Sequence, residues 1–144
     1  MSYLPPIIPQ DTRSQHSTMK VIRGSQIGYE AASHEDPKNP GVLKRVLATR
    51  DDFIAGQIMM LNWARLPQGS SFAAHYHEDM QETFVILTGK VQMVVGEESV
   101  ELNAGDAIMI DHHEVHQMHN QSDHDVEYIV FGVATEQGGK TVVV

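Results

Sequence analysis

Two histidine-containing clusters constrain this chain more than any other feature of its sequence. The first contains His75, His77 and Glu82, and the second contains His116. Side chains alternate between the faces of a strand, so His75 and His77 would project from the same face. A turn through 78–81 would let the next strand bring Glu82 beside them, whereas His116 can join only if the sheet curls back on itself. Three imidazoles and one carboxylate form a plausible ligand set for a borderline divalent metal.

The spacing within the two clusters resembles that of the cupin family. The first cluster reads Gly69, five residues, His75-x-His77, four residues, Glu82, six residues and Gly89, and the second has Gly105, His116 and Asn120 at the family spacing. Where the family usually has Pro and Gly, this chain has Asp111 and His113, two residue types that tolerate a positive φ better than most. The resemblance implies an all-β, double-stranded β-helix (jelly-roll, cupin-like) barrel in which His75, His77, Glu82 and His116 bind metal.

The strand pattern agrees with such an architecture. The expected strands are 42–48, 53–64, 71–77, 82–88, 91–95, 99–102, 107–110, 115–120 and 126–134, with a short one at 20–27, an edge strand at 141–144 and a possible bulge at Gly56. Short strands at regular spacing with Gly-rich or Asn/Asp-rich breaks indicate a sandwich or barrel. We therefore expect an N-terminal arm and loop over 1–41, with His34 as a solvated loop residue, and a single barrel domain over 42–144.

Composition excludes several classes of function. The formal net charge of −9 argues against a nucleic-acid partner, whose phosphates need a basic face. The absence of cysteine leaves only nitrogen and oxygen ligands for a metal. There is neither an apolar run long enough for a membrane span nor a signal-peptide pattern, so we expect a cytoplasmic protein.

Alternation also predicts which side chains line the space above the metal. Phe84 and Ile86 share the face of Glu82, while Met118 and Asn120 share that of His116. We predict that these four residues bind substrate, with Asn120 supplying a hydrogen bond. The alternative for the three apolar residues is ordinary barrel core. Trp63 and Tyr76 are expected to be core or interface aromatics. Tyr76 lies between two inward histidines and so faces outward, as a residue of a subunit interface would.

Four further histidines, His112, His113, His119 and His124, have two interpretations. Surface positions near loops are favoured over a second metal site or a proton relay.

Two functional classes remain open. In the first, the chain is a metalloenzyme with one divalent transition metal per chain (Fe, Mn, Ni, Zn or Cu) that acts on a small oxygen-bearing molecule. Similar small cupins include dioxygenases, isomerases or epimerases, and lyases, which makes a metal-dependent oxidoreductase or isomerase the expected type. In the second, the chain is a non-catalytic small-molecule or metal-binding protein or sensor. A homodimer is expected in either case, because an exposed edge strand invites pairing and C₂ dimers are the commonest oligomers.

Overall fold

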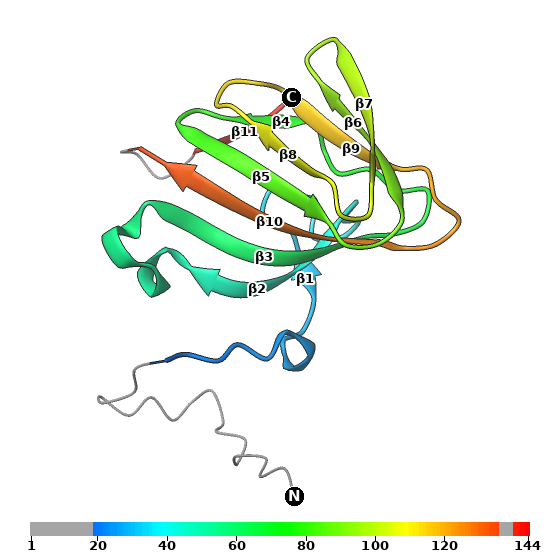
Figure 1. The fold of residues 1–144 in the computed structure, drawn as a ribbon. Helices are drawn as coiled ribbons and strands as arrows, with labels where there is room; N and C mark the ends of the chain where they lie inside the picture. The colour runs from blue at the N-terminus through cyan, green and yellow to red at the C-terminus, as the bar shows by residue number, and fades with distance from the viewer. Residues whose placement is uncertain (1–18, 136–139) are drawn as a thin grey trace, which may run out of the picture.

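Two antiparallel β-sheets lie face to face in the computed structural model, which describes residues 19–135 and 140–144 (Figure 1). The larger sheet contains, in spatial order, β1 (Glu30–Ala31), β2 (Leu43–Thr49), β3 (Ile58–Leu66), β10 (Val126–Ala134), β5 (Met80–Ile86) and β8 (Ala107–Ile110). The smaller sheet contains β11 (Thr141–Val143), β4 (His75–His77), β9 (His116–Asn120), β6 (Lys90–Val95) and β7 (Glu98–Asn103). Most neighbouring strands are non-consecutive in sequence, such as β10 between β3 and β5 and β9 between β4 and β6, as in a double-stranded β-helix. The predicted fold class is confirmed.

The core lies between the sheets because apolar residues alternate along the inner strands. Its largest fully buried apolar side chains are Phe72, Phe84, Leu66, Ile86, Met93 and Met118. Burying each such side chain contributes roughly 1.5–3 kcal/mol to stability. The core therefore holds the inner faces of both sheets at fixed positions, and the polar inward residues are fixed with them.

Several local expectations were wrong. The segment 20–27 is not a strand but contains the 3₁₀ turn η1 (Gly24–Gln26), whose Gly24 carbonyl accepts a hydrogen bond from Arg45 (3.0 Å). Two further 3₁₀ turns, η2 (Arg50–Asp52) and η3 (Ile54–Gly56), delay the start of β3 to Ile58. Asp52 stabilises this break because its carboxylate accepts the Thr49 backbone N–H (2.9 Å).

The irregularities in strand register lie at positions other than Gly56, where a bulge was expected. Gly56 adopts φ +61° within η3, so it makes a turn. The register shifts occur instead between Val46 and Ala48 and between Gly132 and Val133.

The turn before β9 shows how the chain accommodates the departure from the family pattern. His113 adopts φ +67°, and its backbone N–H donates to the His77 carbonyl (2.7 Å). The turn is thereby fastened to the strand that carries the first two histidines.

Strand β11 lies at an outer position of the smaller sheet, as expected for 141–144. Dimerisation through this edge stays a prediction. No helix among the described residues is long and apolar enough to cross a membrane.

Candidate metal site

Four side chains from three strands meet inside the molecule. His75 and His77 come from β4, His116 comes from the neighbouring strand β9, where it pairs with His75, and Glu82 comes from β5 in the facing sheet. All four are buried, and one ligand atom from each lies within 4.8 Å of the others. The sandwich thus brings together the four residues that the sequence predicted as metal ligands.

The outer nitrogen of each imidazole has a polar partner. Nδ1 of His75 donates to the Ala73 carbonyl (2.6 Å), and Nδ1 of His116 donates to the Glu114 carbonyl (2.9 Å). Since a carbonyl only accepts, both rings carry the proton on Nδ1 and a lone pair on Nε2. Nδ1 of His77 lies 3.0 Å from the Thr141 hydroxyl on β11.

The inner atoms fit a metal ion. Nε2 of His77 and Nε2 of His116 are buried without a hydrogen-bond partner. Nε2 of His77 lies 2.5 Å from a Glu82 oxygen, but the approach lacks hydrogen-bond direction. Buried polar atoms left without a partner are costly, and a divalent cation would satisfy these nitrogens and the Glu82 carboxylate together.

Electrostatics prepare these groups for a cation. Burial lowers the pKa of His75 to about 4, so its ring is neutral at pH 7. Burial alone would raise the pKa of Glu82, but its contacts with His116 and His77 outweigh that effect and bring the pKa to about 2. A neutral imidazole and an ionised carboxylate are the protonation states that metal binding requires.

Comparison with known families agrees with this geometry, since residues 62–132 match the model of the cupin domain. The chain belongs to the cupin superfamily. A comparison with curated proteins gave no match.

Solved structures of other cupins superpose on most of this chain. A Thermotoga maritima protein described as a predicted oxalate decarboxylase has 27% identity, covers 80% of this chain and 99% of its own, and has a TM-score of 0.71. The polyketide cyclase RemF from Streptomyces resistomycificus has 20% identity, covers 88% and 87%, and has a TM-score of 0.69. A sugar phosphate isomerase from Silicibacter pomeroyi has 17% identity, covers 85% and 92%, and has a TM-score of 0.65. The last two likenesses concern the fold alone.

The predicted substrate-binding residues of this cupin all point inward. Phe84 lies beside the site, with its ring centroid 6.0 Å from that of His116. Ile86 lies two residues further along β5, on the same face of the strand. Phe84, Ile86 and Met118 all belong to the hydrophobic core. Their contact with a substrate stays a prediction.

Asn120 has a structural role. Its Nδ2 donates to the carbonyls of Leu66 (2.9 Å), Pro67 (3.2 Å) and His124 (2.9 Å), and its Oδ1 accepts the Ser122 backbone N–H (2.8 Å). These bonds use both its donor and its acceptor atoms, so the geometry does not favour its predicted role in orienting a substrate.

We therefore expect Asn120→Ala to destabilise the fold. The change leaves three buried or half-buried carbonyls without this donor and should lower the free energy of unfolding by about 2–4 kcal/mol, measured by urea denaturation. Metal content per folded chain should stay unchanged. Weaker ligand binding at unchanged stability would restore the substrate-binding role.

The expectation that His34 is a solvated loop residue was wrong. Its side chain is only 16% exposed and stacks on His75, with ring centroids 4.0 Å apart. The adjacent Glu35 accepts the backbone N–H groups of Ala73 (2.8 Å) and Gly41 (3.2 Å), which holds this loop over the site. Nothing in the local pattern of 29–41 signals this packing, because it depends on a long-range loop contact.

Two further inward polar residues were not identified from the sequence. Tyr128 on β10 is 3% exposed and packs against Phe84, with centroids 5.5 Å apart. Burial, and then the charges of Glu82 and Glu35, raise the pKa of its phenol, which stays protonated at neutral pH. Asn62 on β3 is buried, and its Oδ1 has no hydrogen-bond partner. The alternation of inward and outward side chains along β10 and β3 could have identified both as inward residues.

The four further histidines, all within the described residues, lie outside the site. His112, His113 and His124 are exposed, and His119 is half-buried, with Nδ1 2.5 Å from the Ser71 hydroxyl. Within 19–135 and 140–144, only one group of three or more potential ligands is close enough to hold a metal.

Thr141 is the outer partner of His77, so its hydroxyl should affect metal affinity. We expect Thr141→Val to weaken metal binding about tenfold, because loss of such outer partners typically weakens affinity by 10–100-fold. Thr141→Ser keeps the hydroxyl and should bind as the wild type does, in a competition titration with a chromophoric chelator. Equal affinities for both variants would show that this contact does not orient His77.

Acid should destabilise the metal-free protein. The pKa of His75 is about 4 in the fold, against about 6.5 in an unfolded chain, so between these values the unfolded state binds more protons. Stability should fall as pH decreases from about 6.5 to 4, by about 3 kcal/mol from His75 alone. Urea midpoints over this range measure the effect. His75→Gln should flatten the dependence, and an unchanged slope would contradict the assignment.

Proposed function

We propose that this cupin is a metalloenzyme that acts on a small oxygen-bearing molecule bound at the His75, His77, Glu82 and His116 group. The observation that supports this proposal is the convergence of four buried ligand atoms within 4.8 Å, two of them nitrogens without any other partner. A metal held by four protein ligands keeps up to two octahedral positions for other oxygens, and it supplies Lewis-acid polarisation or, if redox-active, oxygen activation.

The residues around the group support a substrate site. The rings of Phe72 and Phe84 lie within about van der Waals reach of the histidines, with centroids 5.2 Å from His75 and 6.0 Å from His116, respectively. They exclude water and strengthen polar interactions nearby. Tyr128, with its protonated phenol, can donate a hydrogen bond inside this apolar space.

Elemental analysis together with turnover tests the proposal. The purified protein should contain about one transition metal per chain, and the metal-loaded form should convert small hydroxy- or oxo-compounds in a panel of isomerase, lyase and dioxygenase assays. A chelator should abolish turnover, and re-addition of metal should restore it. Ligand binding without turnover across the panel would identify a binding protein or sensor instead.

A further inference from the structure

Resting on this proposed function, we propose that the substrate reaches the metal site through a cleft between β7 and β8, and that it is an uncharged or cationic molecule with an apolar body. Small dicarboxylates such as oxalate are excluded by this proposal. Three features of the cleft support it: its volume, its position in the strand register and its charge.

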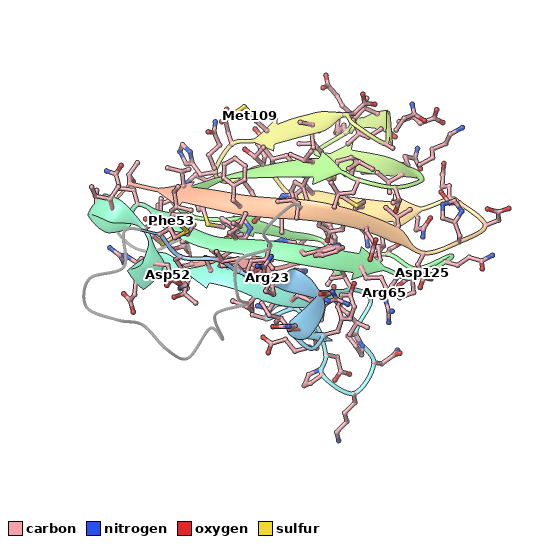
Figure 2. The ribbon with its side chains drawn as sticks, turned by 60° about the horizontal axis from the view of Figure 1, so that its bottom comes forward. Arg23, Asp52, Phe53, Arg65, Met109 and Asp125 are labelled. Carbon is pink, nitrogen blue, oxygen red and sulfur yellow. The ribbon has the colours of Figure 1, made fainter. Side chains whose placement is uncertain are left out.

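The two sheets do not close on each other between β7 and β8, which are the outer strands on this side (Figure 1). A cavity of about 310 Å³ opens there, with apolar walls formed by Met93, Val95, Val100, Ile108, Met109 and Ile110. Val100 and Met109 are 44% and 64% exposed, and Figure 2 shows Met109 at the outer edge of the larger sheet. This volume is at the lower end of the range for small-molecule sites.

The inner wall of the cleft adjoins the metal group. Val95 pairs directly with His116, and Ile110 pairs directly with Glu82. Side chains of directly paired residues project from the same face of a sheet at about 4.5–5.5 Å between Cβ atoms. A molecule in the cleft is therefore separated from two of the four metal ligands by a single pair of side chains.

The charge of the cleft selects against anions. Its polar lining includes Glu98, Asp111 and Glu114, all exposed, and none of the described residues that line it is Lys or Arg. Three carboxylates, each about 6 Å from a bound anion in a water-like medium, would together weaken binding of that anion by about tenfold or more. A neutral or cationic molecule meets no such penalty, and the apolar walls suit its body.

A matched set of catechols separates the metal-binding end from the body of the ligand. 4-Methylcatechol, 3,4-dihydroxybenzoate and 3,4-dihydroxybenzylamine share the same chelating diol and carry a neutral, anionic and cationic group. Calorimetry with zinc-loaded protein should give dissociation constants for the neutral and cationic probes at least about tenfold below that of the anionic probe. Glu98→Gln should narrow the gap about two- to threefold, and Glu101→Gln, on the other face of β7, should leave it unchanged.

A steric variant tests the route. Val100→Trp should weaken binding of all three probes about tenfold while metal content stays at the wild-type level. Glu101→Trp should leave both probe binding and metal content unchanged. Equal binding of the anionic and neutral probes, or tight binding of oxalate, would overturn the charge selectivity, and unchanged binding to Val100→Trp would overturn the route. If the wild type proved to be a dimer and Val100→Trp a monomer, a second copy of the chain would occupy the cleft, which would also overturn the route. Failure of every probe to bind fully metal-loaded protein would contradict the proposed function itself.

Discussion

Replacing His75 and His77 together by alanine is expected to reduce metal content from about one ion per chain to less than a tenth. The pair would supply two of the four donor atoms, and both residues lie on the three-residue strand β4. Loss of an outer partner alone costs 10–100-fold in affinity, so loss of two ligands should cost more than about 10⁴-fold. Elemental analysis of the folded fraction measures the outcome.

The matched control is the double variant His112→Ala, His124→Ala. Both residues are exposed histidines outside the four-residue group, so metal content should stay at the wild-type level. Circular dichroism should show that both double variants keep the β-sheet fold. Full metal content in the His75, His77 variant would refute the assignment of the site.

The shared inward position of His75 and His77 could be predicted because these residues obey the simplest rule of strand geometry. His75 and His77 are two residues apart on one strand and are both buried, while Tyr76 between them is half-buried. The same alternation correctly placed Met118 and Asn120 inward with His116, and the residues between them, Gln117 and His119, are half-buried. Here the local pattern and the tertiary structure agree.

The rest of the site depends on contacts between distant segments. His34 covers His75 only because Glu35 connects its loop to Ala73 and Gly41, and no periodicity in the loop encodes that. The role of Asn120 was likewise set by three carbonyls from two other turns. The cleft is a further example, since it depends on which two strands are left at the sheet edges.

Gly41→Ala is expected to cause a large loss of stability, whereas Gly28→Ala, at the other end of the loop that carries His34, is not. A Cβ at Gly41 would lie 2.0 Å from the Ser71 carbonyl oxygen and 3.3 Å from Cα of Phe72. The obstacle is backbone, which cannot rotate away, so the segment must shift. Overpacking of this kind typically costs 1–3 kcal/mol or more, and we expect about 3 kcal/mol by urea denaturation.

The same substitution should weaken metal binding, because the displaced segment leads into the site. Ser71 and Phe72 directly precede Ala73, whose carbonyl orients His75, and Glu35 bonds to the backbone at both Ala73 and Gly41. Gly28→Ala is the matched control, because no heavy atom lies within 4 Å of a Cβ there, and it should change neither stability nor affinity appreciably. If Gly41→Ala were as stable as Gly28→Ala, the close approach of this loop to Ser71 would not exist in solution. A destabilised Gly41→Ala variant with unchanged metal affinity would show that His75 is oriented independently of the loop.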